Sequence, residues 1–186
     1  MQLATLTARS PASHAPLTGT TKCPGCGLAV PATLGPTHAY VGASPGCWEL
    51  YRRLSTAPYA RAPGSRLRRL VEDAYAVQHP GVPGRRSLQS VAVHLMGLCT
   101  LLEREAQERR LVPVLGRMPA RKTMDLHWLE PPARNGRLNI NHVIEAGFEN
   151  GHAKAVEAWA RDVWRAWAPH HATVHGWLDA PCRHGD

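Results

Sequence analysis

Three cysteines near the start of the chain have the types and spacing of metal ligands. Cys23 and Cys26 bracket a Pro-Gly pair in the stretch KCPGCG, and Cys47 follows the same pair in ASPGCW. A Cys-x-x-Cys turn points both sulfurs to one side, and thiolates are preferred ligands of zinc. The inner glycine lets backbone N–H groups face the sulfurs. The pattern therefore predicts a zinc knuckle within residues 22–48.

Tetrahedral zinc then needs two more ligands. Cys47 is the expected third, since a place in the first turn of a helix favours the thiolate through the helix dipole. His38 lies between the two cysteine motifs, and a loop of this length can bring it to the metal. The predicted ligands of this structural zinc site are Cys23, Cys26, His38 and Cys47. Two alternatives stay open: a redox dithiol at Cys23 and Cys26, and Cys47 as a plain buried thiol.

Eleven histidines supply a second, weaker set of candidates. His171 and His175 are four residues apart on an expected helix and so share a face. His79 and His94 come from a helix end and a buried helix, with Asp73 close to His79 in sequence. If these elements meet, they would form a second metal or acid–base centre with candidate catalytic residues His79, His94, His171 and His175. The alternative is that His94 is a hydrogen-bonded core residue and that His170 and His171, beside Pro169, are polar groups at a helix end.

The elements that must position these residues are expected from local signals. Ser44 and Pro45 are typical of a helix start, and that helix should end before Pro58. A second helix, 66–78, should end near His79, because the residue before a proline avoids the helical region. Further helices are expected at 87–110, 141–147, 152–168 and 172–178, with an extended strap within 111–139.

The helix at 87–110 is expected to be the central one. Its first two thirds are apolar on most sides, and Cys99 lies there among leucines, so we expect Cys99 to pack in the core. These patterns predict a mainly α fold, a compact helical bundle with an N-terminal zinc-knuckle loop. The expected organisation is a flexible tail at 1–21, a single domain at 22–180 and a tail at 181–186.

Composition narrows the class of protein. With 186 residues, 44% of them hydrophobic, the chain can bury a core. The net charge of +8 comes from nineteen Arg and three Lys against fourteen acidic residues, but the arginines are scattered in pairs, which does not favour a nucleic-acid surface.

Five cysteines, with three clustered near the start, suit a reducing cytoplasm. The longest apolar segment, 91–102, is too short to span a bilayer, and no signal-peptide run is seen, so we expect a cytoplasmic protein without a membrane partner.

Several short motifs together resemble a known family. They are CPGCG, GPTHAYVGASPGCW, VEDAYAVQHPG, SVAVHLMGLC, LHWLEPP and AVEAWARDVWRAWAPHH. Over roughly residues 22–178 the chain is similar to an uncharacterised bacterial family of small proteins, a domain of unknown function. The resemblance implies one folded unit that contains these Cys, His and Trp positions, and it implies no reaction. After LHWLEPP the chain departs from the expected pattern, so His142 is not counted as a family site.

These observations favour a zinc-stabilised binding or interaction module of unknown activity. Zinc would fix the N-terminal loop, and a tryptophan-rich surface would bind a protein or a small molecule. One alternative is a metal-dependent, hydrolase-like enzyme that uses the histidine group to activate water. The other is a nucleic-acid-binding regulator, whose affinity would fall steeply with salt. Whether the protein is an enzyme stays open at this point.

Overall fold

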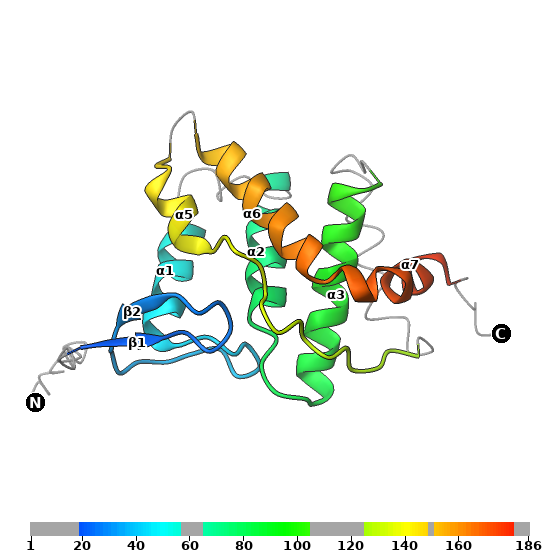
Figure 1. Cartoon of the computed structure of the whole chain (residues 1–186), viewed down its shortest axis with the longest axis horizontal. Helices are drawn as coiled ribbons and strands as arrows, with labels where there is room; N and C mark the ends of the chain where they lie inside the picture. The colour runs from blue at the N-terminus through cyan, green and yellow to red at the C-terminus, as the bar shows by residue number, and fades with distance from the viewer. Residues whose placement is uncertain (1–18, 57–64, 105–124, 149–150, 181–186) are drawn as a thin grey trace, which may run out of the picture.

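The computed structural model describes residues 19–56, 65–104, 125–148 and 151–180, and these are mainly helical. The α-helices are α1 (Pro45–Ser55), α2 (Arg66–Gln78), α3 (Arg85–Leu102), α5 (Ile140–Glu145), α6 (His152–Ala166) and α7 (His171–Asp179), and η2 (Ala168–His170) is a short 3-10 helix. Strands β1 (Thr20–Lys22) and β2 (Ala29–Pro31) pair antiparallel. Figure 1 shows the hairpin and α1 at one end of the molecule and α7 at the other, with α2, α3 and α6 between them. The predicted mainly α fold class is confirmed.

Helices α1 and α2 begin and end where the local signals placed them. The Ser44 hydroxyl accepts a hydrogen bond from the Cys47 backbone N–H at 3.4 Å, and Pro45 occupies the first turn of α1. Helix α2 ends at Gln78, and His79 leaves the helical region with φ −128° and ψ 61°. Pro80 follows, and the steric rule for the residue before a proline accounts for this end.

Other elements differ from the prediction in their bounds. Helix α3 begins two residues earlier than expected, and the expected end at Arg110 lies outside the described residues. The knuckle expected to be built from loops contains a hairpin instead, and β1 includes the last two residues of the predicted tail 1–21. Strands of three residues are too short to show the alternating pattern by which strands are recognised in a sequence.

The tryptophans mainly fill the core. Trp159 and Trp167 are fully buried, and Trp164 and Trp177 are nearly so. The two others, Trp48 and Trp128, pack partly buried against the same core cluster. The indole rings therefore supply packing volume rather than the exposed binding surface that we expected. Within the described ranges, none of the helices combines the length and the hydrophobicity that a bilayer span requires.

Residues 125–139 form an extended strap across the helices (Figure 1), and the rest of the predicted segment, 111–124, lies outside the described residues. Gln78 fixes the strap, because its side-chain amide donates to the carbonyls of Asn135 and Leu138 at 2.7 Å each. The side-chain amide oxygen of Gln78, Oε1, in turn accepts from the indole N–H of Trp159 at 3.1 Å. Asp162 of α6 accepts from the backbone N–H of Leu138 at 2.8 Å. These polar contacts join the strap, α2 and α6 at one place.

Candidate metal centre

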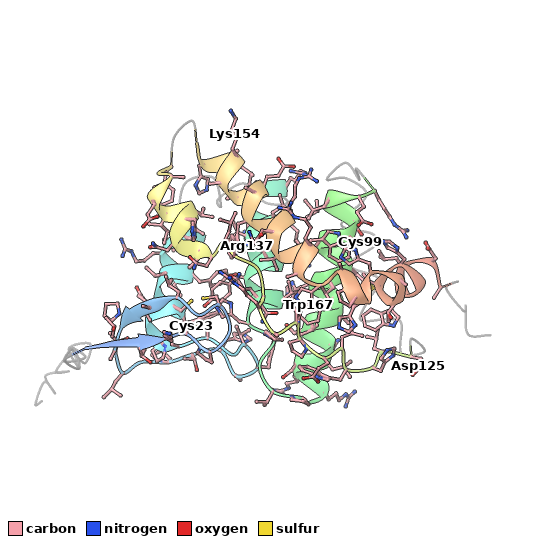
Figure 2. All side chains as sticks on the ribbon, in the orientation of Figure 1. Cys23, Cys99, Asp125, Arg137, Lys154 and Trp167 are labelled. Carbon is pink, nitrogen blue, oxygen red and sulfur yellow. The ribbon has the colours of Figure 1, made fainter. Side chains whose placement is uncertain are left out.

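Four side chains from three parts of the chain meet beneath the hairpin. They are Cys23 and Cys26 in the turn between β1 and β2, Cys47 in the first turn of α1, and His79 directly after α2. Their ligand atoms all lie within 4.8 Å of one another. Cys23, Cys47 and His79 are buried, and Cys26 is half-buried. Figure 2 labels Cys23 at the hairpin end of the molecule.

Two separations between donor atoms match tetrahedral coordination. Cys26 Sγ lies 3.8 Å from Cys47 Sγ, and Cys47 Sγ lies 3.5 Å from His79 Nε2. Tetrahedral zinc, with Zn–S of about 2.3 Å and Zn–N of about 2.0 Å, keeps two sulfurs about 3.8 Å apart and sulfur about 3.5 Å from nitrogen. The sulfur separation is far too long for a disulfide, and the cysteines are free. These two separations therefore fit tetrahedral zinc, and all four donors lie within 4.8 Å of one another.

Helix α2 orients His79 toward the sulfurs. Its Nδ1–H donates to the backbone carbonyl of Tyr75 at 2.7 Å, since a carbonyl can only accept. In the neutral ring this leaves the lone pair on Nε2, the atom that faces Cys47. A backbone carbonyl on the other ring nitrogen is a usual partner of a metal-bound histidine. His79 is thus presented as a ligand by the last turn of its own helix.

Gly25 of the knuckle lies in close contact with the end of α2. A Cβ at Gly25 would meet the His79 ring and would lie 2.8 Å from the Gln78 carbonyl oxygen and 2.9 Å from the His79 Cα. Only glycine leaves room for this approach. On the other side, the backbone N–H of Gly42 donates to the His79 carbonyl at 3.0 Å. Two parts of the knuckle, at Gly25 and at Gly42, therefore pack around His79.

The thiols and the imidazole strongly perturb one another's protonation. Hydrogen bonds from Cys26 and Cys47 lower the pKa of Cys23 far below its usual range, and the Ser44 backbone N–H donates to the Cys23 sulfur at 3.4 Å. Hydrogen bonds with Cys23 and Cys26, together with burial, raise the pKa of Cys47. Burial lowers the pKa of His79, but hydrogen bonds with Cys23 and Cys26 outweigh it and raise the pKa to about 9. The cluster thus favours one thiolate beside an imidazolium, and a divalent cation would favour loss of the remaining protons.

Three of the four predicted ligands meet at this site, and His38 lies elsewhere. Its ring packs against Tyr40 and Trp48, with ring centroids 4.3 Å and 5.4 Å away. The fourth donor is His79 instead, which the sequence indicated only as a member of a different histidine group. His38 lies between the cysteines in the sequence, whereas His79 lies 32 residues beyond Cys47. The sequence feature that could have indicated this ligand is the His-Pro-Gly motif, in which His79 directly follows α2.

The other candidate histidines do not join His79 in a single centre. His94 of α3 bonds through Nδ1 to the buried carboxylate of Asp73 on α2 at 2.6 Å. His171 and His175 lie on α7, where His175 contacts Glu103 at 2.6 Å. The second centre required His79, His94, His171 and His175 to meet, and the described structure holds them in three separate places instead. The reason is helix packing, because α3 places His94 beside Asp73 of α2, whereas α7 places His175 beside Glu103.

Comparison with known proteins gives a family and no activity. The model of a family described as "Family of unknown function (DUF5946)" matches residues 21–168, which include both cysteine motifs and His79. No curated protein matches the chain, and no solved structure does. The match ends at residue 168, ten residues before the end of the region, 22–178, over which the motifs resemble the family. The chain belongs to this family of unknown function.

Proposed function

We propose that the protein is a zinc-stabilised binding module whose metal is structural. The observation that supports this is the set of three sulfurs and one imidazole nitrogen, buried except for the half-buried Cys26, within 4.8 Å of one another and with two separations at tetrahedral values. Structural zinc sites are closed by four protein ligands, whereas catalytic sites keep an open position. Thiolate-rich sites favour zinc over magnesium or calcium. The ligands would be Cys23, Cys26, Cys47 and His79.

Zinc would join the hairpin, the start of α1 and the end of α2. The hairpin has two strands of three residues, in which only Val30 is buried. An isolated two-stranded hairpin is marginally stable in water. Bonds from its turn to a metal would supply the stability that its small apolar contacts lack.

The binding face of the proposed module is a groove on this metal-supported unit. The groove has a volume of about 490 Å³, and its lining includes Val30, Pro31, Leu34, Trp48, Leu50, Arg52 and Arg53. Leu34 is 62% exposed, so an apolar side chain stands open to solvent here. The arginines lie in the last turn of α1. Arg52 is paired with Glu49, another lining residue, at 3.0 Å, so Arg53 leaves the lining with a net positive charge. Apolar walls with this net charge fit an apolar segment that carries an acidic residue.

Zinc content tests the structural site. The purified protein should hold a tightly bound zinc that Cys26→Ser loses, and Cys182→Ser serves as the thiol control that keeps it. Cobalt exchanged into the site should show the charge-transfer absorption of several thiolates. Full zinc retention by Cys26→Ser would contradict the proposed ligand set.

An anionic apolar dye tests the groove. We expect 8-anilinonaphthalene-1-sulfonate to bind the zinc-loaded protein and Leu34→Asp to weaken that binding at least about tenfold, by placing a charge in the apolar wall. Val82→Asp is the matched control, because Val82 is 77% exposed and does not line the groove. Equal binding by the two variants, or none by the wild type, would rule out this face.

A further inference from the structure

A second group of metal-binding side chains lies where the end of α3 meets α7. Cys99 and Glu103 are one helical turn apart, and His175 faces them from α7. Their donor atoms all lie within 4.8 Å of one another. Glu103 Oε2 is 3.7 Å from Cys99 Sγ and 2.6 Å from His175 Nε2. Figure 2 labels Cys99 on α3 near α7, well away from Cys23.

Helix α6 holds the carboxylate of Glu103 in place. The indole N–H of Trp164 donates to Oε1 at 2.7 Å, which leaves Oε2 for Cys99 and His175. Burial raises the pKa of Glu103, but the hydrogen bonds from Trp164 and His175 outweigh it and lower that pKa. The carboxylate is therefore ionised and oriented by three helices at once.

His171 lies beside this group but outside the set of donor atoms within 4.8 Å of one another. Its ring stacks on Trp164 with centroids 3.7 Å apart and an interplanar angle of 9°. Its Nε2–H donates to the Trp164 carbonyl at 3.0 Å, so the lone pair of the neutral ring is on Nδ1. That Nδ1 lies 3.9 Å from Glu103 Oε1. The arrangement repeats the one at His79, where a backbone carbonyl fixes one nitrogen and the other faces the cluster.

We propose that Cys99, Glu103 and His175 bind a second divalent transition metal. Thiolate, carboxylate and imidazole together suit zinc or cobalt. Three protein ligands leave a fourth position, which the Nδ1 of His171 or a water molecule would take. The side chains of Glu103 and His175 are 36% and 41% exposed, so an ion can reach them.

The metal would replace a proton at this site. Glu103 and His175 are now 2.6 Å apart, which is a hydrogen bond, whereas oxygen and nitrogen ligands of tetrahedral zinc stay about 3.3 Å apart. Metal binding would therefore remove the shared proton and move the partly exposed His175 ring outward. Cys99 would lose its thiol proton as well, so binding should release protons. The competing explanation is a plain ion pair that fastens α3 to α7.

Equilibrium dialysis against zinc near neutral pH distinguishes these explanations. The wild type should bind two equivalents, and His175→Gln and Cys99→Ala should each bind one. His142→Gln is the control, because His142 is an exposed histidine of α5 outside the cluster. Cobalt reports on the second site separately. In the zinc-loaded His142→Gln control, mild dialysis empties the second site and leaves zinc in the first. Cobalt added afterwards should enter the second site and show charge transfer from a single thiolate.

The two proposed sites fail in different ways. Loss of one equivalent in Cys26→Ser reports on the first site, and loss of one in His175→Gln reports on the second. Thermal melting of His175→Gln, a partly exposed position, shows whether the variant is folded. A folded His175→Gln that binds as much zinc as the wild type, or a wild type that binds only the equivalent lost with Cys26→Ser, overturns the second site.

Discussion

The imidazole of His79 occupies the space in which a side chain at residue 25 would stand, so the turn that carries Cys23 and Cys26 rests directly on the end of α2. The contact is possible only because residue 25 is Gly25. It explains why a histidine far along the chain, rather than one inside the loop, completes the cluster of sulfurs.

Substitution of Gly25 should therefore weaken both zinc binding and folding. In Gly25→Ala the new Cβ meets the His79 ring and the Gln78 carbonyl, so the knuckle must move away from α2. We expect a loss of about 1–3 kcal/mol in the free energy of unfolding, the usual cost of overpacking. Gly35→Ala is the control, since its Cβ would meet only Pro45 at 3.8 Å. Competition with a chromophoric chelator and denaturant titration measure the two effects, and equal values for both variants would contradict the contact.

The identity of the fourth ligand can be decided with two histidine variants. His79→Gln should lower zinc affinity by well over tenfold, because it removes a donor 3.5 Å from Cys47 Sγ. His38→Gln should keep zinc, since His38 packs on Tyr40 and Trp48 outside the cluster. Chelator competition on both proteins is the measurement. The reverse order of affinities would restore the ligand set expected from the sequence.

Removal of zinc should loosen one end of the molecule selectively. A metal that binds only the folded state contributes about 4 kcal/mol when its free concentration is 1,000 times Kd. After chelation we expect lower thermal stability and faster amide exchange in β1, β2 and α1. Exchange in α3 and α6, which share the tryptophan core, should change less. Uniform loss of protection along the chain would show that the metal supports the whole bundle.

Two helical glycines should respond to alanine with opposite signs. A Cβ at Gly97 of α3 would meet the carboxylate of Asp73, with its Cγ 2.8 Å away. That carboxylate is buried between Arg69 at 3.0 Å and His94 at 2.6 Å and has no room to move. Gly97→Ala should therefore destabilise the fold by about 1–3 kcal/mol.

In Gly176→Ala the new methyl group would meet nothing within 4 Å. The helix propensity of alanine should then stabilise α7 by up to about 1 kcal/mol. Chemical denaturation of both variants gives the signs, and destabilisation by Gly176→Ala as large as by Gly97→Ala would refute the assigned clash.

His152 should make stability fall in mild acid. Burial lowers the pKa of His152 below its usual value near 6.5, against a hydrogen bond with the Gly147 carbonyl at 3.1 Å. The unfolded chain therefore takes up the proton at a higher pH than the folded protein does. Stability contributed by neutral His152 is complete above the unfolded pKa and decreases as pH falls below it, by at most about 1.4 kcal/mol per pH unit.

The comparison of wild type with His152→Gln isolates this effect from the titration of the zinc ligands. The difference between their free energies of unfolding should change between about pH 7 and pH 5, and the wild type should be the protein that loses more on acidification. Denaturant titration at both pH values is the measurement. A difference that is the same at both values would exclude a shifted pKa at His152.

The sequence by itself determined the local elements of this protein. The Cys-x-x-Cys turn, the Ser44 cap and the proline after His79 act within a few residues, so the knuckle and the bounds of α1 and α2 followed from them. Apolar spacing likewise located the main helices, because a buried helix face repeats along the chain.

Only the tertiary structure decided which distant residues meet. His79 joins Cys47 across 32 residues and His175 joins Glu103 across 72, and both pairs depend on how whole helices pack. Four of the six tryptophans are buried in the core instead of on a surface for the same reason. Helix packing is set by the fit of many side chains at once, and no spacing within a single segment of the sequence records it.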